Sequence, residues 1–215
     1  MTKKRALFLF ISFLVPNAYF LTPIAHATEL EDAITRGNRL VSQKKYDLAI
    51  REYEIAVKAS PKDPKANLLL GLTYANVGEM KKAITYTEDS LKSEPSFSAY
   101  NNLGLIYANQ LDYKKSIENY EKALKLNDSS ARTWYQMGLV YSSDLKFDKA
   151  VECFQKSLTL NPAMTDAYLG LGSSYYWLEK KDKALEQVKA LKDKKEKEKA
   201  IALESWIKSK DAKKA

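Results

Sequence analysis

Five glycines recur at nearly even spacing along the chain, and no other feature constrains the fold as strongly. The steps between them are 34, 33, 34 and 34 residues, and the five are Gly37, Gly71, Gly104, Gly138 and Gly172. A fixed period of this length is typical of a repeat architecture, in which one helical or hairpin unit is copied and the copies stack on one another. The sequence therefore predicts a linear array of similar units.

Other residues keep the same register. Three residues after four of the glycines stands a tyrosine: Tyr74, Tyr107, Tyr141 and Tyr175. Twelve residues after each glycine stands a small residue: Ala49, Ala83, Ser116, Ala150 and Ala184. Four positions further on come Tyr53, Thr87, Tyr120, Phe154 and Val188. Small residues let two antiparallel helices approach closely, and a large neighbour fills the space beside them. Each unit is therefore expected to be a pair of packed helices.

A proline follows the second expected helix in three of the copies, at Pro61, Pro95 and Pro162, and stops it there. This combination of residues resembles the tetratricopeptide repeat family over residues 30 to about 192. The resemblance implies an all-α fold, a right-handed α-solenoid of about five antiparallel helix pairs. The copies are expected near 30–63, 64–96, 97–130, 131–164 and 165–194, within an array spanning 28–194.

The expected helices lie between the turn residues and prolines of each copy. They span 30–43, 46–58, 64–77, 80–92, 98–110, 113–126, 131–143, 147–159, 165–178 and 181–192. Residues 195–215 are expected to form a capping helix and a basic tail, because the last pair of an array would otherwise expose its apolar face. Within this segment, the helix is expected over 195–209 and a frayed end over 211–215.

The first 27 residues have the layout of a secretory signal peptide. Lys3, Lys4 and Arg5 precede an apolar run, and a small-residue pattern ends at Ala27, where cleavage is expected. An uncleaved membrane anchor is the alternative, since the run is long enough to span a bilayer. Prolines within it favour cleavage, and the chain is then expected to be exported, to a periplasmic or secreted location.

The chain carries a net charge of +8, and the positive charge lies at its two ends. Residues 28–178 hold equal numbers of basic and acidic side chains, whereas 179–215 hold 13 lysines and eight acids. An exported protein with a balanced body is not expected to bind nucleic acid. The lysine-rich tail leaves a second interpretation open, a peripheral cell-envelope component that docks on an anionic surface.

The sequence offers little for catalysis. The only histidine, His26, lies in the expected signal peptide, so a histidine-based triad or metal site is not expected in the mature chain. No glycine-rich phosphate loop is present, and no cofactor is expected. The single cysteine, Cys153, is either an inert core residue or, if exposed, a candidate for an intermolecular disulfide. The chain is therefore not expected to be an enzyme.

The resemblance implies that the first helix of each pair lines a concave groove that binds a peptide or helix of another protein. The residues at the corresponding positions include Asn38, Lys65, Leu72, Asn76, Asn101, Leu105, Asn109, Arg132, Tyr135, Tyr176 and Trp177. Amide side chains can bond a peptide backbone, and aromatic side chains often anchor interfaces. Tyr176 and Trp177 have an alternative role, packing against the capping helix. The leading hypothesis is a non-enzymatic interaction scaffold or assembly adaptor, whose oligomeric state the pattern does not specify.

Overall fold

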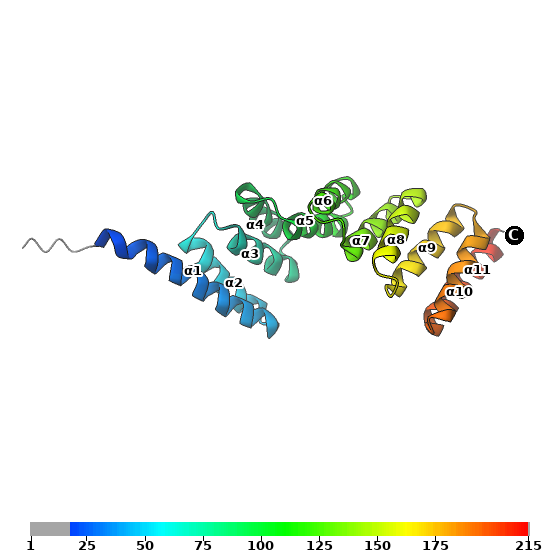
Figure 1. Cartoon of the computed structure of the whole chain (residues 1–215), viewed down its shortest axis with the longest axis horizontal. Helices are drawn as coiled ribbons and strands as arrows, with labels where there is room; N and C mark the ends of the chain where they lie inside the picture. Colours follow the sequence, from blue (N-terminus) through cyan, green and yellow to red (C-terminus); the bar gives the residue numbers. More distant parts are fainter. Residues whose placement is uncertain (1–17, 215) are drawn as a thin grey trace, which may run out of the picture.

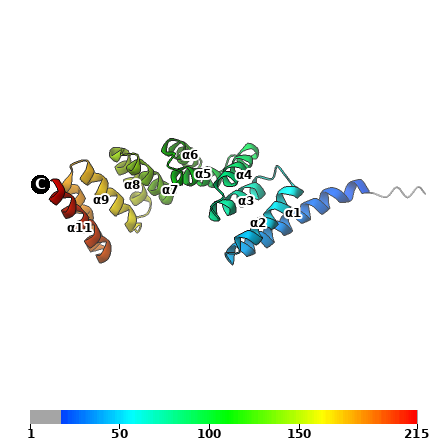
Figure 2. The same ribbon diagram turned by 180° about the vertical axis from the view of Figure 1, so that it is seen from behind.

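The computed structural model describes residues 18–214, which form eleven helices and no strand. The helices follow one another in an elongated, curved array from α1 at one end to α11 at the other (Figure 1). Figure 2 shows the same succession from behind. The helices are α1 (Ala18–Ser42), α2 (Tyr46–Ala59), α3 (Pro64–Asn76), α4 (Met80–Ser93), α5 (Phe97–Asn109), α6 (Tyr113–Leu126), α7 (Ala131–Ser143), α8 (Phe147–Leu160), α9 (Thr165–Trp177), α10 (Lys181–Asp193) and α11 (Lys197–Lys214). The expected all-α fold of stacked helix pairs is confirmed.

Two helix ends differ from expectation by more than two residues. Helix α1 begins at Ala18 rather than near residue 30, so the expected cleavage point after Ala27 lies within it; residues 1–17 of the expected signal peptide lie outside the described residues. Helix α11 continues past residue 209 because Asp211 is held by two partners, the Tyr176 hydroxyl at 3.0 Å and the Lys181 ammonium at 2.7 Å. Across 18–214, no helix has the length and apolar character needed to cross a bilayer.

The period-34 glycines lie where the two helices of a pair come closest. A Cβ on Gly104 would stand 2.6 Å from the Tyr120 ring, and a Cβ on Gly138 would stand 2.8 Å from the Phe154 ring. Real Cβ atoms do not approach other atoms so closely, so a larger residue would push the helices apart. Thr87 takes the place of the aromatic ring in the second copy. In the first, third and fourth copies, the glycine of the first helix and the aromatic residue of the second helix are therefore one packing unit, whereas Gly172 of the fifth copy meets Leu203 of α11.

Neighbouring copies are joined by the tyrosines that follow the glycines. The Tyr74 hydroxyl donates a hydrogen bond to Glu54 of the preceding copy at 2.7 Å, and the Tyr175 hydroxyl accepts one from Gln155 at 2.9 Å. A lysine ammonium of the same copy lies 5.0 to 5.6 Å from the ring centre in four copies, within cation–π range. The pairs are Lys82–Tyr74, Lys115–Tyr107, Lys149–Tyr141 and Lys183–Tyr175.

Cys153 lies in the core between the later copies and is 3% exposed. Burial raises the pKa of its thiol to about 12, so the thiol stays protonated at neutral pH. A buried, protonated thiol is a poor nucleophile. The structure thus supports the interpretation of Cys153 as an inert core residue over that of an exposed disulfide partner.

Candidate functional site: a pocket between the first helices

A pocket of about 590 Å³ lies between α5 and α7. Its apolar lining includes Leu105 and Leu139, whose side chains are 40% and 41% exposed. These residues occupy the same register in successive copies, so stacking of the repeats places their side chains next to one another. Burying a large apolar side chain is favourable by about 1.5–3 kcal/mol relative to exposing it. The pocket therefore offers exposed apolar surface that an apolar group could cover.

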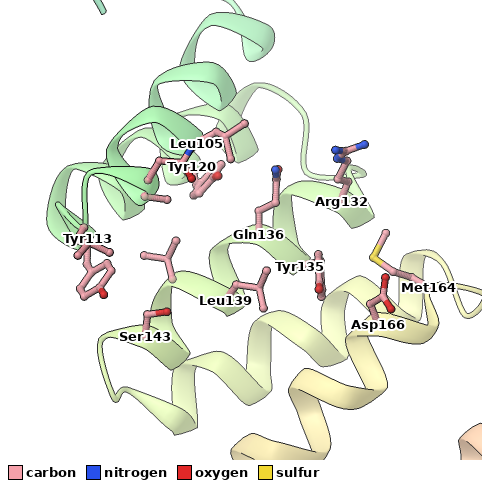
Figure 3. A pocket seen from close by; sticks show the side chains of 14 residues that line it. Leu105, Tyr113, Tyr120, Arg132, Tyr135, Gln136, Leu139, Ser143, Met164 and Asp166 are labelled. Atoms are coloured by element: carbon pink, nitrogen blue, oxygen red, sulfur yellow. The ribbon is translucent and has the colours of Figure 1, made fainter. Parts of the chain in front are cut away.

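Polar groups line the same pocket (Figure 3). Arg132, Gln136 and Asp166 lie at or near one end, whereas Tyr113 and Ser143 lie at the other, where α5 and α7 end. The Gln136 Oε1 atom is buried without a hydrogen-bond partner. In Figure 3 its amide nitrogen points into the space between α5 and α7. A side-chain amide in this position can donate to a carbonyl group of a bound chain.

Tyr135 forms part of the pocket floor. Its ring packs against the buried Phe154 ring with a centroid separation of 5.8 Å. Burial raises the pKa of its hydroxyl, and the Asp166 carboxylate adds to the shift. Tyr135 is therefore a neutral, partly buried ring held by the core, the kind of rigid aromatic side chain that anchors interfaces.

Asp166 is already compensated within the chain. The Lys199 ammonium of α11 lies 2.6 Å from its Oδ1 atom and donates a second hydrogen bond to Thr165 at 2.7 Å. The hydrogen bond with Asp166 raises the pKa of Lys199. Arg132 at the same end forms no salt bridge within residues 18–214. This end of the pocket consequently carries an excess of positive charge.

The pocket continues toward α11. Tyr135, Leu139 and Asp166 also border a shallower hollow of about 390 Å³, whose far side is formed by Leu203 and Trp206. The capping helix therefore lines the groove as a further first helix would. No residue of α11 was among those expected in the groove, because the tail lacks the glycine register of the five copies.

The structure brings four of the residues expected in the groove into this pocket, namely Leu105, Asn109, Arg132 and Tyr135. The others lie elsewhere along the array. Asn101 of α5 accepts a hydrogen bond from Thr133 at 2.9 Å. Asn38 of α1 accepts one from the Tyr53 hydroxyl at 2.7 Å, and Lys65 of α3 lies 3.8 Å from Glu31. Leu72 and Asn76 are partly buried and exposed, respectively, on α3.

Tyr176 packs against the capping helix, which is the alternative role stated for it above. Its ring is 4% exposed and meets the Trp206 ring of α11 edge-on at 5.3 Å, so it is covered by the capping helix rather than open to a partner. Trp177 is 43% exposed, but it stacks on Phe147 at 5.9 Å and lies beneath the Lys210 ammonium. Both side chains pack against the capping helix because α9 ends beside it.

Residues that line the pocket but were absent from the sequence-based site include Leu111, Tyr113, Gln136 and Met164. They lie outside the positions that the resemblance implied, in turns or at other helix positions. Leu111 could have been noticed in the sequence, because the residue at the corresponding position of the second copy is Gly78.

Comparison with known proteins is consistent with this geometry. Models of the tetratricopeptide repeat match residues 95–163, 135–199 and 64–97, and a model described as TPR repeat matches 37–78. The chain is a tetratricopeptide repeat protein. Proteins of this family are scaffolds for protein–protein interaction and are typically not enzymes. As a member of this family, the tetratricopeptide repeat chain is described as an interaction scaffold.

Among solved structures, MamA is 30% identical, with a TM-score of 0.71, and the match covers 75% of this chain and 95% of that one. YrrB, described as a TPR protein with an unusual peptide-binding site, is 21% identical with a TM-score of 0.71 over 84% of this chain and 98% of that one. At that identity the likeness to YrrB shows the fold alone.

Curated relatives match a shorter segment. The Hsp70-Hsp90 organizing protein 1 of Glycine max is 34% identical over 68 residues, 32% of this tetratricopeptide repeat chain. The corresponding protein 2 of Arabidopsis thaliana is 32% identical over 62 residues. The matched segments are only 12% and 11% of those relatives' own lengths.

Proposed function

We propose that this tetratricopeptide repeat protein is an assembly adaptor that holds a peptide or helix of another protein in the pocket between α5 and α7. The proposal rests on one observation: both apolar and polar groups of that pocket lack partners within the described part of the chain. Two half-exposed leucines lie beside an amide whose oxygen is buried without a partner and an arginine without a salt bridge within 18–214. A protein segment supplies apolar side chains, backbone N–H donors and carboxylates together, which match the leucines, the amide oxygen and the arginine respectively.

Site-specific photo-cross-linking in the native host tests the proposal. A photoreactive residue replaces Tyr135 in the pocket, and a matched control places it at Lys156, an exposed position on α8 that no part of the pocket includes. We expect a discrete protein adduct from position 135 and none from position 156. Adducts from 156 alone would mean that the second helices bind the partner, and the proposed groove would then be wrong.

We also propose that the adaptor acts outside the cytoplasm. The support is the basic start, apolar run and small-residue pattern ending at Ala27. If the proposal is correct, N-terminal sequencing of the protein purified from its host should begin at Thr28. A chain that retains residues 1–27 and sediments with membranes would favour the anchor instead, and a full-length chain in the cytosolic fraction would refute export.

Docking through the lysine-rich tail has weaker support. Several tail lysines are engaged within the chain: Lys192 and Lys208 both contact Glu204, at 2.8 and 3.0 Å, and Lys181 contacts Asp211. The hydrogen bonds from Lys192 and then Lys208 lower the pKa of Glu204 to about 2, which keeps this carboxylate charged. Acids interleaved in this way reduce the positive surface that an anionic membrane would attract.

A further inference from the structure

In every copy, the second residue after the end of the first helix has a left-handed backbone. The φ angles are 58° at Lys44, 85° at Gly78, 61° at Leu111, 57° at Leu145 and 60° at Glu179. Backbone hydrogen bonds close each of these turns; at Leu111, the next residue's N–H donates to the Tyr107 carbonyl at 3.0 Å. This is the helix ending at which glycine is the usual residue, because a Cβ is disfavoured there.

The second copy shows what the turn itself requires. It has Gly78 at this position, and a Cβ built there would meet nothing within 4 Å. The fold therefore offers no packing for a side chain at this turn. Leu111 and Leu145 are accordingly 69% and 74% exposed, the highest values among the large hydrophobic residues of the described chain. A leucine here combines an unfavourable backbone conformation with an exposed apolar side chain.

These two leucines lie beside the pocket. Leu111 is one of its lining residues, together with Tyr113, and Leu145 follows two residues after Ser143, another lining residue. Figure 3 shows that Tyr113 and Ser143 mark the end of the pocket nearest the turns. Leu111 thus extends the apolar lining of the pocket to the turn after α5, and Leu145 presents an exposed leucine at the corresponding turn after α7.

The opposite end of the pocket carries the charge. Arg132 lies there without a salt bridge in the described part of the chain, and Asp166 is neutralised by Lys199. The site is therefore polarised, with an apolar end at the turns and a positive end at Arg132. A ligand that complements both ends needs a large apolar side chain and, displaced from it, a carboxylate.

We infer that Leu111 and Leu145 are binding residues, and that the partner segment carries large apolar side chains flanked by acidic ones. The inference rests on the proposed function and specifies the partner's chemistry. Local departures from the preferred residue of a turn are expected where function requires them. Four of the five turns hold a residue other than glycine, but at these turns only Leu111 and Leu145 expose a large apolar side chain, and that exposure is such a departure.

Synthetic peptides test the inference. Two fluorescein-labelled peptides share the same leucines and phenylalanine and carry either glutamates or lysines beside them. Fluorescence anisotropy with the wild-type chain should show the glutamate peptide binding at least about tenfold more tightly, because the lysine peptide would place like charge near Arg132. If the wild-type chain binds neither peptide, or binds both equally, the inferred partner chemistry is wrong.

The double variant Leu111→Gly, Leu145→Gly separates binding from folding. We expect it to weaken binding of the glutamate peptide at least about fivefold while raising Tm by about 2–4 °C, because glycine relieves the left-handed strain. Leu126→Ala, which removes a leucine that is 52% exposed at the end of α6, is the control and should leave the affinity unchanged. A lower Tm in the double variant, or unchanged peptide affinity, would overturn the inference.

Arg132→Gln tests the charged end. It should reduce the preference for glutamate over lysine to about twofold or less, whereas the double leucine variant should weaken both peptides and keep the preference. A preference that survives in Arg132→Gln would contradict the charge assignment. The cross-link from position 135 remains an independent readout: an adduct there with failed peptide binding would reject this inference and leave the proposed function standing.

Discussion

Replacing Phe154 with alanine should lower the free energy of unfolding by about 3–5 kcal/mol, the range for a fully buried phenylalanine. The ring is 0% exposed and fills the space between two copies. On one side it faces Gly138 of its own copy, and on the other a Cβ on Gly170 of the next copy would stand 2.5 Å from it. Removing the ring therefore leaves a cavity at a junction that both copies share.

Urea denaturation followed by circular dichroism at 222 nm measures this effect. Leu160→Ala is the control, since Leu160 is the last residue of α8 and is 37% exposed. We expect the control to lose less than about 1 kcal/mol, because little buried area is removed. A loss below about 1 kcal/mol in the Phe154 variant as well would mean that the junction collapses around the missing ring, and the packing unit described above would be wrong.

Deleting residues 197–215 should destabilise the C-terminal end of the array and make the protein aggregate. Helix α11 buries Ala200, Leu203 and Ile207, each at most 4% exposed, against α9 and α10. Two large side chains buried at about 1.5–3 kcal/mol each give an expected loss of at least about 3 kcal/mol. The deletion also uncovers Leu191 and Tyr176, which are buried in the intact chain.

Thermal unfolding and light scattering report the two effects of this deletion. A chain that ends after Asp211 is the control, because it keeps the contacts of Asp211 with Tyr176 and Lys181. We expect the control to resemble the full chain and the 197–215 deletion to melt at lower temperature and scatter light. A deletion variant that stays monodisperse, with unchanged Tm, would show that α11 does not cap the array.

The periodic part of the fold could be predicted from the sequence with little error. The starts of helices α2 to α10 fall within one residue of their expected positions, because glycine, alanine and the large residue four positions later occupy fixed places in each pair. The expectation that Tyr135 faces a groove between first helices came from the resemblance to the tetratricopeptide repeat family. Whether that groove binds protein remains a prediction.

The largest errors in the fold lie where the period ends. The burial of Tyr176 depends on how α11 folds back on α9, and no repeated residue encodes that contact. The extension of α1 to Ala18 has no counterpart in the other copies either. Gln136 and Leu111 entered the pocket through side-chain placement between copies, which the sequence pattern does not specify. Of these features, only the leucine at position 111, where the second copy has Gly78, could be read from the sequence alone.

The tyrosine contacts between successive copies imply how the array would respond to being pulled. The Tyr74 hydroxyl bonds to Glu54 and the Tyr175 hydroxyl to Gln155, each in the preceding copy, so the contacts that would resist the pull are local and similar in kind. A solenoid of this type lengthens by releasing helix pairs singly. Each released copy of about 34 residues would contribute roughly 110–120 Å of extended chain. The molecule would therefore lengthen in steps, with its outer copies unfolding while α5–α7 stays folded.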